Sequence, residues 1–274
     1  MTLVYACIAP HGSEIIDEIT PRATRSRFRE TRCGMKKLAK RIIDYHPDTV
    51  VIATPHNLRL WKHICVVTSE NSSGKLEGQN HKYISLRVHC DVQFSRQLLA
   101  VGSRKLPVVG ANYGSAEGAT SDMPMDWGTF IPLWFLRHNR SLKVTMITPS
   151  REIPLSQNFL FGRLAANLME RDHSKRYVFI ASADQAHAHK KSGPYGFNRA
   201  AGLYDEAVLN AIRTNNLSPL LRLRPNFVEN AKPDSLWQIA MLAGVLDKVK
   251  MKGKLLTYQV PTYYGMLCAE FETQ

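Results

Sequence analysis

Three histidines stand at the ends of short apolar segments that have the composition of buried strands. The segments are Leu3–Pro10 before His11, Thr49–Pro55 before His56, and Tyr177–Asp184, which is followed closely by His187. In an open α/β sheet, ligands bind outside the carboxyl ends of the strands. Two neutral imidazoles that converge at such an edge suit a first-row transition metal. We therefore expect these histidines to lie at one edge of a sheet and to form a reactive site there.

Two of the histidines share the same local sequence, since His11 and His56 each follow a proline that follows an apolar segment. Proline cannot donate in a strand ladder, so it helps to end the strand and leaves the imidazole to project from the sheet edge. A single histidine near a strand end is more often a hydrogen-bonded structural residue. Three in the same context make a functional site as strong an interpretation as the structural one.

A metal site of this kind also needs an anionic ligand, and two carboxylates are candidates. Asp234 stands just ahead of the apolar segment Leu236–Leu246, where capping of a helix is a sufficient structural role for it. Glu229 follows Phe227 and Val228 and has no such capping role. This comparison favours Glu229 as the ligand and keeps Asp234 as the alternative.

The elements that must position these residues alternate along the chain. Apolar, β-branched segments predict strands at Leu3–Ala9, Thr49–Ala53, Lys143–Ile147, Tyr177–Ala181 and Leu255–Val260. Helical periodicity predicts helices at Arg25–Tyr45, Ser156–Arg171, Ala200–Thr214 and Asp234–Leu246. The polar stretch Thr68–Asn80 is expected to be a loop, followed by a weak outlying strand at Tyr83–Val92. The alternation predicts an α/β fold, a single domain over residues 1–274 with a mainly parallel central sheet and helices on both faces.

Composition narrows the class of protein. The chain has 274 residues, with 36 Lys and Arg against 23 Asp and Glu, a net charge of +13. The densest basic run, Arg22–Arg41, has apolar residues at helical spacing and is expected to be an amphipathic helix with a solvated basic face, not a nucleic-acid-binding element. Five scattered cysteines form no disulfide or zinc pattern. With no apolar stretch long enough for a membrane span and no signal-peptide pattern, we expect a cytoplasmic protein that binds no membrane.

Several motifs together resemble the class III extradiol ring-cleavage dioxygenases, the superfamily of the catalytic subunit of protocatechuate 4,5-dioxygenase. They lie in the expected order over nearly the whole chain: Ala9–Gly12, Thr54–His56, Met125–Leu133, Ser182–His189, Gly193–Phe197 and Val260–Met266. The segment Lys232–Trp237 and the carboxyl-terminal tail look most like the 2-aminophenol 1,6-dioxygenase branch.

The resemblance implies a non-haem Fe(II) ion, an aromatic substrate and O2. Carried over to this chain, it makes His11 and His56 the histidine ligands, Glu229 the carboxylate ligand and His187 the catalytic acid–base residue. It also implies a homo-oligomer or a pairing with a related subunit.

Three further residues are expected at the substrate, namely Trp127, His189 and Tyr195. Trp127 departs from the family pattern, because several relatives have a histidine at this point of the Asp-x-Gly-Thr motif. Tryptophan offers one N–H donor and no acceptor, so the substrate need not be protocatechuate. A catechol or a 2-aminophenol is the expected ring.

Other functions remain open at this level. Imidazole and carboxylate also suit zinc, so a metal-dependent hydrolase on the same scaffold is one alternative. A non-catalytic or Memo-like member of the superfamily is another. The sequence contains no G-x-S-x-G elbow, no Walker loop and no G-x-G-x-x-G after a strand, which argues against those catalytic templates.

Overall fold

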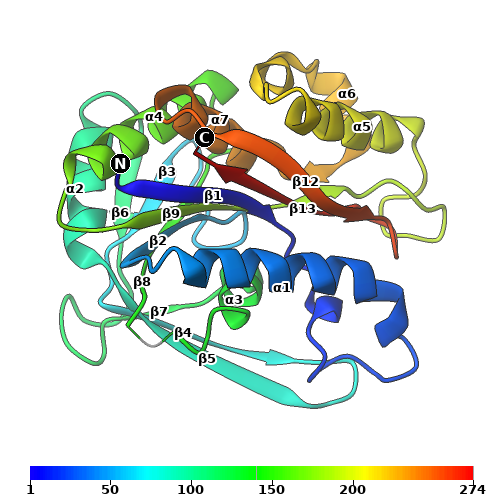
Figure 1. Cartoon of the computed structure of the whole chain (residues 1–274), viewed down its shortest axis with the longest axis horizontal. Helices are drawn as coiled ribbons and strands as arrows, with labels where there is room; N and C mark the ends of the chain where they lie inside the picture. The colour runs from blue at the N-terminus through cyan, green and yellow to red at the C-terminus, as the bar shows by residue number, and fades with distance from the viewer. Residues whose placement is uncertain (140, 274) are drawn as a thin grey trace.

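The computed structural model describes residues 1–139 and 141–273 and has a large mixed sheet at its centre (Figure 1). Eleven strands form this sheet: β1 (Leu3–Ala9), β2 (Thr49–Ala53), β3 (Ile64–Val67), β4 (Asn71–Glu77), β5 (Tyr83–Cys90), β6 (Val108–Ala111), β7 (Asp122–Pro124), β8 (Lys143–Thr148), β9 (Tyr177–Ser182), β12 (Lys252–Gln259) and β13 (Met266–Glu272). A separate short ladder joins β10 (Asp184–Ala186) to β11 (Pro233–Asp234).

The core of the sheet is parallel, as predicted. The main path runs β12-β13-β1-β9-β2-β8-β5-β4-β7, and β1, β9, β2 and β8 pair in parallel. Antiparallel pairs lie mainly outward of this core, between β13 and its neighbours and between β4 and β5. The four parallel strands therefore end at one edge, which is where the reactive histidines were expected.

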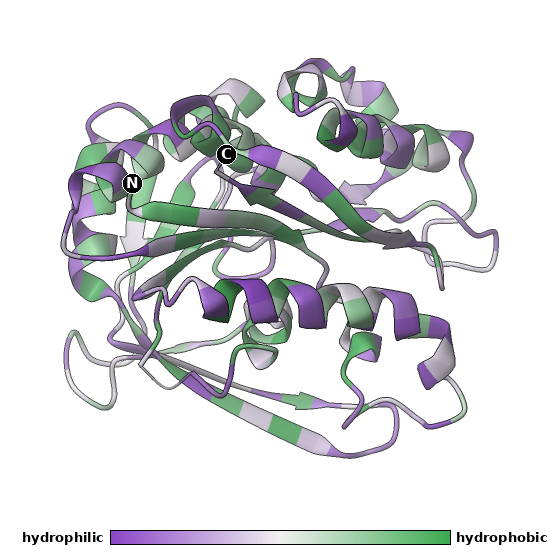
Figure 2. Ribbon diagram, viewed as in Figure 1, coloured by the Kyte–Doolittle hydropathy of each residue, from purple (hydrophilic) through white to green (hydrophobic). Residues whose placement is uncertain are grey.

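Helices cover both faces of the sheet. They are α1 (Arg29–Asp44), α2 (Val92–Ser103), α3 (Trp127–Trp134), α4 (Leu155–Arg171), α5 (Arg199–Arg213), α6 (Pro225–Ala231) and α7 (Leu236–Lys248). Side chains of α2, α4, α5 and α7 share one apolar core with the sheet, whereas α1 and α3 share a second core on the other face. The central strands are accordingly apolar along their length, and α1 alternates between hydrophilic and hydrophobic residues (Figure 2).

Helix α1 accounts for most of the basic run. Met35, Leu38 and Ile42 point into the core, while Lys36 and Lys37 are exposed. The predicted amphipathic helix is thus confirmed, although its first turn, Arg25–Phe28, is a 3-10 helix.

The prediction of a loop over Thr68–Asn80 was wrong, because most of this stretch is strand β4. Its backbone pairs with β5 and β7. Its polar side chains are satisfied there, since the Ser72 hydroxyl donates to the carbonyl of Met123 at 2.8 Å and the Ser73 hydroxyl donates to Asp122 at 3.0 Å. A polar strand is stable when neighbouring elements accept its hydrogen bonds.

The expected helix from Asp234 begins two residues later, at Leu236, because Asp234 belongs to β11. No helix within the described ranges is long and apolar enough to cross a membrane.

Candidate metal centre and its cavity

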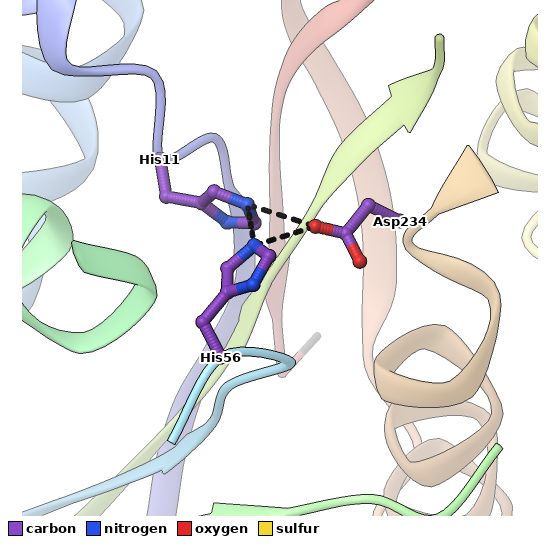
Figure 3. A group of neighbouring side chains, drawn as sticks. All are labelled: His11, His56 and Asp234. Carbon is purple, nitrogen blue, oxygen red and sulfur yellow. Dashed lines mark hydrogen bonds and ion pairs between the residues drawn. The ribbon is translucent and has the colours of Figure 1, made fainter. Parts of the chain in front are cut away.

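Two histidines and one aspartate converge at the carboxyl edge of the parallel strands (Figure 3). The Nε2 atoms of His11 and His56 lie 3.2 Å apart. The Oδ2 atom of Asp234 lies 2.7 Å from His56 Nε2 and 3.3 Å from His11 Nε2. We call these three residues the donor cluster.

The strand order explains why the two histidines meet. His11 follows β1 and His56 follows β2, and both strands pair in parallel with β9, which lies between them. The last residue of β9, Ser182, stands at the same edge. Its hydroxyl donates to the carbonyl of Gly128 at 2.5 Å and lies 3.0 Å from His11 Nδ1. Since that hydroxyl proton is already used, the Ser182 oxygen accepts from His11 Nδ1, which orients His11 Nε2 toward His56 and Asp234.

The motif around Asp126 holds the turn that carries His56. The Asp126 carboxylate accepts hydrogen bonds from the Thr54 hydroxyl at 2.5 Å and from the Asn57 amide at 3.0 Å, one on each side of His56. It also caps α3 by accepting from the backbone N–H of Thr129. This arrangement explains the Asp-x-Gly-Thr motif as a support for the second histidine.

Asp234 reaches the histidines through an unusual turn. Helix α6 ends at Ala231, its C-cap residue Lys232 has a left-handed φ of +54°, and the chain then enters β11. There Asp234 pairs in register with Asp184 of β10. The second oxygen of Asp234, Oδ1, forms an ion pair with Arg151, which fixes the orientation of the carboxylate.

The structure brings Asp234, and not Glu229, to the two histidines. The Glu229 side chain is 74% exposed at the rim of the cavity and pairs with Lys232, whereas Asp234 joins the two histidines. The capping role that argued against Asp234 is not observed, since Ser235 is the cap residue of α7 and makes no side-chain cap bond.

The electrostatics of the site favour an ionised carboxylate and a neutral base. Burial alone would raise the pKa of Asp234, but hydrogen bonds and charge from His11 and His56 hold that pKa well below its usual range. Burial lowers the pKa of His187, and this outweighs the opposing charges of Asp184 and Asp234. His187 is therefore a neutral imidazole at neutral pH.

His187 presents one nitrogen for chemistry. Its Nδ1 donates to the carbonyls of Gln185 at 2.9 Å and Lys232 at 3.1 Å, so Nε2 has the free lone pair. The ring lines the cavity and stacks on Tyr264, with centroids 5.0 Å apart.

The donor cluster opens into a cavity of about 880 Å³. Trp127 lines it and stacks on His56 with centroids 4.1 Å apart, and Tyr195 lines it beside His187. Both residues therefore line the cavity beside the histidines, and their contact with substrate stays a prediction.

His189 lies elsewhere. It is absent from the described residues that line the cavity, and its Nε2 lies 2.8 Å from Asp205 Oδ2. The Tyr258 hydroxyl donates to the same oxygen at 2.7 Å. This Asp205 cluster (His189, Asp205 and Tyr258) gives no support to the substrate contact expected of His189.

Sequence reasoning missed two supports of the site, Arg151 and Ser182. Arg151 precedes α4 in an irregular segment and carries no local signal of its role. Ser182 ends a predicted strand beside Asp184, so its position at the sheet edge was available, but its pairing with His11 depends on the strand order.

Comparison with known proteins now gives the family. A protein-family model, described as the catalytic LigB subunit of aromatic ring-opening dioxygenase, matches residues 5–267 of this chain. The chain belongs to the LigB family. This membership confirms the resemblance to class III extradiol dioxygenases inferred from the motifs.

One protein related in sequence and one solved structure are similar to this LigB-family chain. Protein CA_C1420 from Clostridium acetobutylicum is 26% identical over 262 residues, covering 94% of this chain and 55% of the relative, so the chain spans about half of that protein. The crystal structure of uncharacterized protein JW3007 from Escherichia coli K12 matches with a TM-score of 0.62 and 16% identity. That match covers 97% of this chain and 99% of the other, which shows a shared fold.

Proposed function

We propose that this LigB-family protein is a non-haem Fe(II)-dependent extradiol dioxygenase that opens a catechol- or 2-aminophenol-type ring with both atoms of O2. The observation that carries the proposal is the donor cluster itself. Two imidazole nitrogens and one carboxylate oxygen on one side of an open cavity are the ligand set of non-haem Fe(II) oxygenases.

The residues present fit such an ion. The three donor atoms lie 2.7–3.3 Å from one another, as expected for atoms that share one ion at about 2.0–2.2 Å. Ser182 accepts from His11 Nδ1, so Nε2 is the nitrogen that would bind the ion, and Asp234 is ionised. When bound, Fe(II) supplies the electron transfer between the aromatic ring and O2.

His187 supplies the proton chemistry in this proposal. Its free Nε2 can accept a proton from a hydroxyl or amino group of the substrate and return it later to an oxygen atom. The backbone carbonyls of Gln185 and Lys232 hold Nδ1–H, so the ring keeps its orientation while Nε2 gains or loses the proton. Trp127 and Tyr195 would flank the substrate ring as aromatic surfaces.

The test is anaerobic loading with Fe(II), followed by measurement of oxygen uptake with a panel of catechols and 2-aminophenols. We expect uptake together with a coloured ring-opened product, and no uptake after the iron is removed. Iron bound at one ion per chain with no uptake for any member of the panel would contradict the proposed reaction.

A further inference from the structure

The cavity has two walls of different chemistry. His187 and Tyr195 lie on one side with Tyr263 and Tyr264, and their rings form a chain of aromatic contacts. A second group of lining residues consists of apolar side chains from other elements. With a volume of about 880 Å³, the cavity falls in the upper part of the range of about 300–1,000 Å³ typical of pockets that enclose drug-sized ligands. A one-ring diol at the donor cluster would leave much of this space unfilled.

The apolar wall consists of five cavity-lining residues: Ile153, Leu155, Leu223, Val228 and Trp237. All belong to, or pack against, the core beneath α4, α6 and α7, and four of them are only half-buried, which leaves apolar surface facing the cavity. The wall begins beside the donor cluster, because Trp237 stacks under the Arg151 guanidinium at 4.7 Å. Exposed apolar surface of this kind in a cavity marks a binding surface.

The cations that line the cavity are already neutralised. Among the described lining residues, Arg151 pairs with Asp234 and Lys232 pairs with Glu229. Glu14 and Glu77 add negative charge to the lining. An anionic group on the substrate would thus find no free cation there and would lose its hydration without compensation.

We propose that the substrate is an aromatic diol or aminophenol with an uncharged apolar arm, an alkyl or aryl group that lies along the apolar wall. This inference rests on the proposed function, since it assumes that the ring binds at the donor cluster. It assigns Leu155, Leu223 and Val228 to specificity for the arm.

Binding and turnover can be measured separately. With Fe(II)-loaded protein under argon, calorimetry gives Kd for catechol, for butylcatechol and for hydrocaffeate, whose arm of similar length ends in a carboxylate. We expect butylcatechol to bind at least about tenfold tighter than catechol, since each buried methylene group contributes about 0.8 kcal/mol. Hydrocaffeate should bind no tighter than catechol. Equal affinities, or tightest binding by hydrocaffeate, would overturn the inference.

Variants of one wall residue sharpen the test. Val228→Lys puts a new cation on the wall and should weaken butylcatechol at least about fivefold relative to hydrocaffeate. Val228→Ala only removes apolar surface from the wall and should weaken the binding of butylcatechol about threefold. Val101→Lys is the matched control, because Val101 is equally half-buried against the same core but lies on α2, outside the cavity lining. Unchanged affinities in both Val228 variants would also overturn the inference.

Admission of air then separates the two proposals. If butylcatechol binds best but none of the three compounds supports oxygen uptake, the inference of an apolar arm is supported and the proposed reaction is contradicted. If all three are turned over with equal affinity, the reaction stands and the apolar arm fails.

Discussion

Two clusters of histidine and aspartate contact the short strand β10, and they differ in what their polar atoms face. In the Asp205 cluster, Oδ2 accepts from His189 and Tyr258, and Oδ1 accepts from the Ala186 N–H at 2.9 Å. Asp205 is 1% exposed. Every carboxylate oxygen in that cluster has a protein partner, so it braces the fold.

The donor cluster also combines histidine with aspartate, but its polar atoms are arranged differently. The Nε2 atoms of His11 and His56 and one oxygen of Asp234 point toward one another at the wall of an open cavity. Proximity of histidine to aspartate is therefore not what distinguishes a candidate metal centre. The distinction lies in donor atoms that converge where a ligand can enter.

The largest effect on Fe(II) binding is expected at Asp234, the carboxylate of the donor cluster. Asp234→Asn should weaken Fe(II) binding by more than about 100-fold and reduce oxygen uptake to background, because even outer-shell partners of a metal ligand contribute about 10–100-fold. Glu229→Gln is the control and should bind iron within about twofold of the unmodified protein. Calorimetric titration under argon measures both, and a reversed order would restore Glu229 as the ligand.

Removal of the base should separate chemistry from metal binding. His187→Gln should lower kcat by about 10²–10⁴ while iron still binds, since general acid–base groups contribute that much. His89→Gln serves as control, because His89 is an exposed histidine that does not line the cavity and whose Nδ1 lies 2.9 Å from Asn71 Oδ1. Turnover within a few-fold of normal in His187→Gln would remove its acid–base role.

Removal of the Ser182 hydroxyl should have a smaller effect on iron binding. Ser182→Ala removes the hydroxyl that accepts from His11 Nδ1 and should weaken iron binding about tenfold. Ser95→Ala is matched in burial, since Ser95 is also fully buried but its hydroxyl donates to Thr145, away from the donor cluster. We expect this control to leave the affinity within about twofold.

The Asp205 cluster should respond in stability instead. Asp205→Asn weakens the hydrogen bonds to His189 and Tyr258 and should lower the free energy of unfolding by about 1–3 kcal/mol. Iron affinity should change by less than about threefold. Chemical denaturation and calorimetry on the same preparation test this, and a large loss of iron affinity would make the Asp205 cluster part of the site.

The smallest expected effect is in the pH dependence of kcat/KM, which tests His187 as the base. Because burial lowers the pKa of His187, its base form should persist below the ordinary histidine value of about 6.5, and kcat/KM should fall only as the pH drops below that value. His187→Gln should lose this acidic limb. A limb centred well above 6.5 in the unmodified protein would contradict the assignment.

The sequence by itself determined the fold class and two of the three donors. Apolar, β-branched segments with helices between them require a buried, largely parallel sheet, and strands that end in Pro-His place their imidazoles at its carboxyl edge. These are local properties of each strand, and their recurrence along the chain made His11 and His56 predictable.

Only the tertiary structure decided the rest. The choice between Asp234 and Glu229 depends on the left-handed turn at Lys232 and on the pairing of β10 with β11, which join segments about 50 residues apart. The strand nature of Asn71–Glu77 depends on hydrogen-bond partners in other elements. The separation of His187 from His189, two residues apart, depends on which element packs against each side of their segment, and a sequence pattern carries no information about that neighbour.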